Sequence, residues 1–246
     1  SRKIGDTVTI TATVAHNEEN LSGETIVLSS SNATFNGQSV AVATGPNGAS
    51  SPYTFTYIYT VAEGHGDAVN AEASNIVITD ASGNASDAGS SSGNSVIIDS
   101  TKPTVSDTHI SISSSPANGV VYLVGETVTA RWDNSASGDN NSDIASVTCD
   151  FSALGGGSAV AMSISNGIYT AGYTITTNSI TGTHNISVTA VDTAGNQRAA
   201  IDSTQITIAS GSLTLTSPNT AVSYIAGATQ AITWDAAGDV RSEEHT

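Results

Sequence analysis

Charged residues, and basic ones above all, are scarce in this chain of 246 residues. Only 11% of the residues are charged, and 6 Lys and Arg stand against 22 Asp and Glu, which gives a formal net charge of -16. Such a negative field disfavours contact with nucleic acid and with anionic membrane surfaces, whereas it attracts divalent cations. The composition therefore argues against a nucleic-acid-binding function.

Cysteine is nearly absent, and long apolar stretches are missing. Cys149 is the one cysteine, so no disulfide can form within the chain. No stretch approaches the roughly 18 apolar residues of a membrane-spanning helix. Cys149 shares one face of a period-two pattern with Ala145, Val147 and Phe151. We therefore expect a small buried side chain at this position, not a nucleophile.

The motifs of common enzymes are absent as well. The sequence holds no G-x-S-x-G elbow, no H-E-x-x-H motif, no phosphate-binding glycine loop and no pair of histidines at metal-ligand spacing. The histidines are scattered through expected loops and strand starts. We therefore expect a chain that is not an enzyme.

The abundant residues are those of strands and turns. Thr and Val favour pleated surfaces, whereas Ser, Asn and Gly compete with helical hydrogen bonding. Apolar and polar residues alternate in seven segments of the second half, at 109–113, 127–132, 144–151, 159–164, 169–175, 185–191 and 201–208. Seven short strands are typical of an immunoglobulin-like (Ig-like) sandwich. We predict an all-β fold of Ig-like β-sandwich domains, with a core that includes Trp132, Val147, Cys149, Phe151 and Val188.

The chain also repeats itself over domain-sized distances. Gly5-Asp6-Thr7-Val8-Thr9 returns as Gly125-Glu126-Thr127-Val128-Thr129, and Asp80-Ala81-Ser82-Gly83-Asn84 returns as Asp192-Thr193-Ala194-Gly195-Asn196. Spacings of this size are those of a domain strung in tandem. We predict one domain at 1–102, a second at 103–209 and the start of a third at 210–240, with Pro103 stiffening the first joint.

Both ends of the sequence look cut. The second domain has an expected strand at 109–113 that has no counterpart in the first, so we expect the first domain to lack its opening strand. Residues 241–246 break the composition of everything before them and resemble the translation of a common sequencing adapter. We therefore interpret them as a tail foreign to the natural protein.

Taken together, the G-D/E-T-V-T strand, the D-x-x-G-N hairpin and the joint Ile98-Asp99-Ser100-Thr101-Lys102-Pro103-Thr104 carry a resemblance. They resemble the tandem Ig-like repeats of large extracellular bacterial proteins such as adhesins. The stretch 213–235 is similar to the Ser-Thr-rich cell-wall-anchored family. The resemblance implies repeats that space a terminal binding domain away from the cell and often bind calcium at their joints.

Two groups of oxygen ligands are candidate calcium sites. Asp139, Asn141 and Asp143 stand at alternate positions, as in part of a calcium loop, although Ile144 replaces the glycine that such a loop needs for its sharp turn. Asp67, Asp99 and Asp107 are expected to gather around the first joint. In contrast, we expect Asp80 and Asp192 to cap backbone N–H groups in their hairpins, with Gly83 and Gly195 at positive φ.

The sequence thus predicts non-catalytic spacer repeats of a secreted or cell-surface bacterial protein, with neighbouring repeats as partners. One alternative is an accessory module of a secreted carbohydrate-active enzyme or protease whose catalytic domain lies outside the fragment. Another is a repeat that itself binds a glycan or a surface ligand. An exposed aromatic cluster would favour glycan binding, but Trp132 and Trp234 lie in alternating strands typical of a core.

Overall fold

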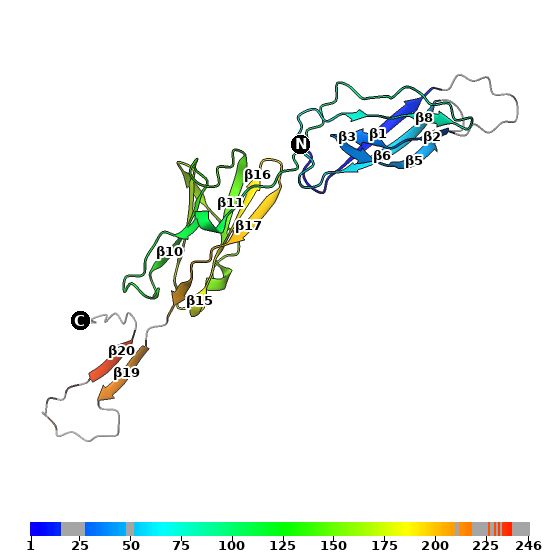
Figure 1. The fold of residues 1–246 in the computed structure, drawn as a ribbon. Coiled ribbons are helices and arrows are strands. Elements are labelled where there is room, and N and C mark those ends of the chain that lie inside the picture. Colours follow the sequence, from blue (N-terminus) through cyan, green and yellow to red (C-terminus); the bar gives the residue numbers. More distant parts are fainter. Residues whose placement is uncertain are drawn as a thin grey trace. The chain divides into compact units, whose positions relative to one another are not determined.

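The protein is described by a computed structural model, which covers residues 1–15, 28–47, 52–209, 212–217, 226, 229, 231 and 233–237. These residues form strands, turns and two short 3₁₀ turns, which confirms the all-β prediction (Figure 1). They fall into two compact units, one of Ser1–Lys102 with Asp192–Asn196 and the other of Pro103–Val191 with Gln197–Thr246. Within the described ranges, no helix is long and apolar enough to cross a membrane.

The first unit is built on the long antiparallel pair of β1 and β6. Tyr53, Phe55, Tyr57 and Tyr59 alternate along β6 and are all buried, because successive side chains of a strand point to opposite faces. The sheet order is β1-β6-β5, with β4-β3-β7 and the pair β2-β8 beside it. The strands are β1 (Thr7–Val14), β2 (Leu28–Ser30), β3 (Ala33–Phe35), β4 (Gln38–Val40), β5 (Val42–Asn47), β6 (Tyr53–Thr60), β7 (Ala73–Ser74) and β8 (Ile78–Asp80).

The second unit is a sandwich of two four-stranded sheets. Their orders are β13-β14-β10-β9 and β12-β11-β16-β17, which is the arrangement of an Ig-like sandwich with one extra edge strand. Its elements are η1 (Asp107–His109), β9 (Ile110–Ile112), β10 (Thr127–Asp133), β11 (Ile144–Asp150), η2 (Ser152–Leu154), β12 (Val160–Ala161), β13 (Ser163–Ser165), β14 (Ile168–Thr174), β15 (Gly182–His184), β16 (Ser187–Asp192), β17 (Gln197–Ile201) and β18 (Ile206–Ile208).

The core of the second unit contains all five residues that the sequence predicted. Trp132, Cys149, Phe151 and Val188 are fully buried, and Val147 is 4% exposed. They lie on inward positions of β10, β11 and β16 and on the residue that follows β11. The period-two pattern identified them correctly because each sheet of a sandwich buries a single face.

Two of the seven expected strands are each broken into two pieces. The segment 159–164 divides at Met162, so that β12 pairs with β11 while β13 pairs with β14 in the opposite sheet. The segment 201–208 divides at Asp202 into β17 and β18, which also belong to different sheets. At each break the chain crosses between sheets, and the residue at the crossing is buried. Alternation alone does not show such a crossing.

Beyond Ile208 the described residues form a single hairpin of β19 (Ser212–Ser217) and β20 (Thr233–Ala237). Apart from residues 226, 229 and 231, the other residues of the predicted third domain lie outside the described part, as do all of 241–246. The interpretation of that tail as foreign to the protein therefore stays a prediction.

Candidate functional site

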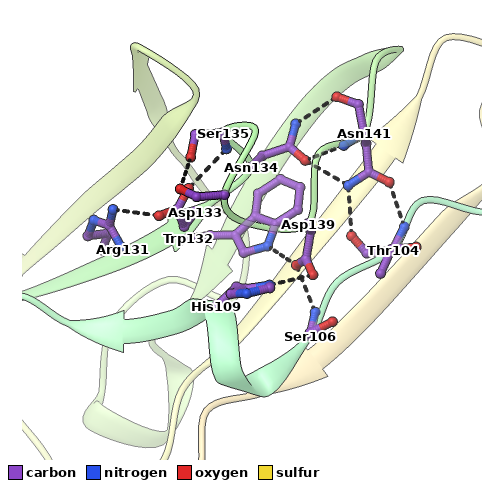
Figure 2. A network of polar contacts seen from close by, with 11 residues as sticks. Thr104, Ser106, His109, Arg131, Trp132, Asp133, Asn134, Ser135, Asp139 and Asn141 are labelled. Carbon is purple, nitrogen blue, oxygen red and sulfur yellow. Dashed lines mark hydrogen bonds and ion pairs between the residues drawn. The ribbon is translucent and has the colours of Figure 1, made fainter.

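The most connected polar site lies where β10 ends in the second unit. Trp132 is fully buried, and its indole Nε1 donates a hydrogen bond of 2.7 Å to Oδ2 of Asp139 (Figure 2). The same oxygen accepts the backbone N–H of Ser106 at 2.9 Å, and Oδ1 accepts Nδ1 of His109 at 2.8 Å. The Asp139 side chain is only 2% exposed, so these three donors replace the water it has lost.

The three hydrogen bonds keep the Asp139 carboxylate ionised. Burial raises its pKa, but the hydrogen bonds from His109, Trp132 and Ser106 together lower it further, so the pKa lies below the ordinary 3.8. Hydrogen bonds to the charged form of a carboxylate favour that form. Asp139 is therefore a buried anion held by donors from two segments, residues 106–109 and β10.

A tight turn brings Asp139 back to the end of β10. Asp133 accepts the backbone N–H of Ser135 and the guanidinium of Arg131, both at 2.9 Å. The side chain and backbone of Ser135 and the Arg131 guanidinium lower the pKa of Asp133 to about 2. Gly138 closes the turn, because a Cβ there would lie 2.2 Å from the carbonyl oxygen of Asp133. A larger residue at this position would displace Asp139.

Asn141 fastens the segment that enters the second unit. Its Oδ1 accepts the backbone N–H of Thr104 at 2.7 Å, and its Nδ2 donates to the carbonyl of Thr104 at 2.8 Å. Asn134 holds Asn141 in place, because its Oδ1 accepts the Asn141 backbone N–H at 2.7 Å. Asn141 thus pairs with Thr104 as a strand would, and Asp139 anchors Ser106 two residues further on (Figure 2). We call Asp139 and Asn141 the linker clamp.

The other two candidate residues of the second unit, Asp107 and Asp143, are not part of the linker clamp. Asp107 accepts the backbone N–H of Ser203 at 2.7 Å and so ties η1 to the chain after β17. Asp143 is exposed at the end of the same loop as the clamp. Of the three residues in the proposed calcium loop, Asp139 and Asn141 form the linker clamp, whereas Asp143 is exposed.

In the first unit, Asp67 holds the segment that leaves the domain. Its Oδ1 accepts the backbone N–H of Ser100 at 2.7 Å, and its Oδ2 accepts the hydroxyl of Thr101 at 3.0 Å. Asp99 accepts the N–H of Thr101 at 3.3 Å, and the Lys102 ammonium pairs with Glu63 at 2.8 Å. The residues on either side of the joint are therefore each bound by side chains of their own unit.

Sequence reasoning found the acids but missed their partners. Ser106, His109 and the indole of Trp132 are the donors to Asp139, and none was named as part of a site. The sequence signal available for the contact between Trp132 and Asp139 was a Trp near the end of a strand with an Asp seven residues later. The hairpin prediction is confirmed, because Oδ1 of Asp80 and of Asp192 accepts N–H groups of its own turn while Gly83 and Gly195 have φ of 90° and 96°.

The site therefore acts as an acceptor for protein N–H groups. Calcium prefers 6 to 8 oxygen ligands, so an ion at Asp139 or Asn141 would compete with the donors that already occupy these side chains. Asp67 and Asp107 also accept backbone N–H groups. Calcium binding at any of the six candidate residues stays a prediction.

Two solved structures are similar to this chain at low sequence identity and low TM-score. The fibronectin(III)-like modules of Clostridium thermocellum CbhA share 19% identity over 85% of this chain and 88% of that chain, with a TM-score of 0.34. SGBP-B from the mixed-linkage glucan utilization locus of Bacteroides ovatus, in complex with a mixed-linkage heptasaccharide, shares 16% identity with a TM-score of 0.22. The match covers 86% of this chain and 43% of that one. No family model and no curated protein matches the sequence.

Proposed function

We propose that this chain is a non-catalytic spacer segment of a secreted or cell-surface bacterial protein of the adhesin type. The observation that carries the proposal is that polar side chains near the first joint form hydrogen bonds to the chain on either side of it. Asp139 and Asn141 bind Thr104 and Ser106, and Asp67 binds Ser100 and Thr101. A module that only spaces other domains needs a well-ordered backbone at its joints, and the hydrogen bonds of these side chains hold that backbone in place.

The placement of the aromatic residues supports a spacer over a glycan-binding module. Nine of the ten aromatic side chains that the structure describes are buried, and Tyr173 is partly buried. Sugar-binding surfaces rely on exposed aromatic and polar groups, whereas Trp132 here is fully inside a core. An accessory role beside a catalytic domain remains the alternative, because such a module would use the same sandwich.

Calorimetric titration of the full chain with soluble glycans tests this choice. The panel includes mixed-linkage glucan oligosaccharides, because the Bacteroides ovatus protein was solved with one. We expect no saturable heat up to millimolar glycan. Binding with a dissociation constant below about 1 mM, which corresponds to about 4 kcal/mol, would replace the spacer function with glycan recognition.

Calcium stiffening of the first joint belongs to the same proposal and rests on the net charge of -16 and the carboxylates at 67, 99 and 107. A ligand that binds the folded form alone raises its melting temperature. We expect millimolar calcium to raise the melting temperature of the chain above its value in chelator. Asp99→Ala should remove most of this gain, whereas Glu72→Ala, at an exposed residue of the same unit, should keep it. Identical melting curves in calcium and chelator would exclude the ion.

A further inference from the structure

Asn166 and Gly167 form the two-residue turn between β13 and β14. Both residues have positive φ, 50° and 78°, which is typical of an Asn-Gly turn in a β-hairpin. Asn166 is exposed, and among the described residues neither its side-chain amide nor the backbone N–H of Gly167 has a hydrogen-bond partner. An Asn side chain can react with the backbone nitrogen that follows it, and both groups are free here.

Two other Asn-Gly pairs within the described ranges are held by hydrogen bonds. Asn36 lies in the equivalent turn between β3 and β4, with φ of 49°, but its Nδ2 donates to the carbonyl of Gly66 at 2.8 Å. Oδ1 of Asn118 accepts the backbone N–H of Val120 at 2.8 Å, and the glycine N–H that follows Asn118 donates to a carbonyl at 2.9 Å. These side chains must break a hydrogen bond before they can reach the next nitrogen, whereas Asn166 need not.

Succinimide formation is the reaction open to Asn166. The backbone nitrogen of Gly167 gives its proton to a base in the solvent and attacks Cγ of Asn166, a C–N bond forms, and the side-chain NH₂ leaves as ammonia. Glycine has no Cβ to hinder this approach. Water then opens the cyclic imide at either carbonyl. One product is aspartate, and the other is isoaspartate, in which the backbone runs through the former side chain and is one carbon longer.

The Asn166 turn is tied to the linker clamp. The carbonyl of Gly167 accepts the backbone N–H of Asn134 at 2.9 Å, and Oδ1 of Asn134 accepts the backbone N–H of Asn141 at 2.7 Å. A Cβ on Gly167 would lie 2.9 Å from Cα of Ser135, so the turn packs tightly against the chain that follows β10. A longer backbone at 166 therefore displaces Gly167, and Asn134 loses its acceptor.

We propose that Asn166 is a site of spontaneous deamidation, and that its conversion to isoaspartate loosens the linker clamp. The reaction consumes only water and needs only a base, so it proceeds with the age of the molecule. The hydrogen bond from Asn134 to the turn is lost first, and the position of Asn141 against Thr104 depends on Asn134. This modification goes beyond the spacer function and does not depend on it.

Peptide mapping of the full chain after incubation at alkaline pH tests the modification. Mass spectrometry with electron-transfer fragmentation locates each deamidated residue and separates isoaspartate from aspartate. In the native chain we expect Asn166 to react at least about tenfold faster than Asn36 and Asn118, because one hydrogen bond fewer has to break. In the urea-unfolded chain these hydrogen bonds are absent, so the three rates should become similar.

Hydrogen exchange of the Asn134 and Asn141 backbone amides tests the effect on the linker clamp. In chains with isoaspartate at 166 we expect both amides to exchange at least about tenfold faster than in the fresh chain, because the hydrogen bonds that protect them open more often. Asn166→Asp adds the charge but keeps the backbone length, so its exchange should stay within about twofold of the parent. Asn166→Gly tolerates positive φ and has no amide, so the same incubation should leave its exchange unchanged.

Two results would each overturn the proposal. The first is equal reaction of Asn166 and Asn36 in the native chain, because the two turns share their backbone geometry and differ in the hydrogen bond of the Asn amide. The second is unchanged exchange of the Asn134 and Asn141 amides in chains that carry isoaspartate at 166.

Discussion

Removal of the Asp139 carboxylate is the sharpest test of the linker clamp. In Asp139→Ala the indole N–H of Trp132 stays buried without an acceptor, because Trp132 is fully enclosed. A buried donor left unpaired costs about 1–3 kcal/mol, and a hydrogen bond to a charged group contributes about 1.5–3 kcal/mol. Ser106 loses its acceptor as well, whereas the His109 side chain is 34% exposed and water can replace its partner. We expect the free energy of unfolding of the second unit to fall by about 3 kcal/mol.

Urea unfolding followed by tryptophan fluorescence measures this loss. The chain has two tryptophans, so the measurement is made in a Trp234→Phe background in which Trp132 alone reports. With a slope of about 1.5 kcal/mol/M, a loss of 3 kcal/mol lowers the midpoint by about 2 M urea. Asp143→Ala is the matched control, because Asp143 is exposed in the same loop, and its effect should stay within about 0.5 kcal/mol.

Asp139→Asn separates the charge from the shape of the side chain. The amide keeps one acceptor but turns an NH₂ group toward donors that bind Asp139 now, so at least one of the three hydrogen bonds is lost. We expect a destabilisation between those of Asp139→Ala and Asp143→Ala. If Asp139→Ala and Asp143→Ala have the same midpoint, the three hydrogen bonds do not stabilise the unit and the clamp argument is wrong.

Two further predictions concern acid and thiol chemistry. The pKa of Asp139 is lower in the folded unit than its ordinary 3.8, so its stabilisation is present above that value and is lost as the pH falls below it. Urea midpoints of the second unit should therefore fall between pH 5 and about pH 3, and Asp139→Asn should reduce this fall; an unchanged slope would contradict the assignment. Burial and the nearby carboxylates of Asp150 and Asp202 raise the pKa of the Cys149 thiol to about 12, so native protein should not react with a thiol reagent at pH 8 while urea-unfolded protein reacts fully. Rapid labelling of the native chain would show that Cys149 is accessible.

Local patterns allowed much of the fold to be predicted. Alternation with a period of two identified the strands that contain Trp132, Cys149 and Val188, because each contributes one buried face to a sandwich. The hairpins at Asp80 and Asp192 were predictable because their turns depend on a carboxylate and a glycine four or fewer residues apart. Such features depend on neighbours in the sequence, so the sequence alone determined them.

The tertiary structure decided where distant segments meet. Met162 and Asp202 mark the points where the chain changes sheets, and a continuous alternation does not reveal which sheet a strand joins. The partners of Asp139 come from positions 106, 109 and 132, so its role depends on contacts across up to 33 residues. An acidic residue in a polar loop can bind an ion, cap a turn or hold another segment. Only the folded chain brings donors to Asp139 and so selects among these roles, because the free energy of a buried carboxylate depends on the groups that surround it.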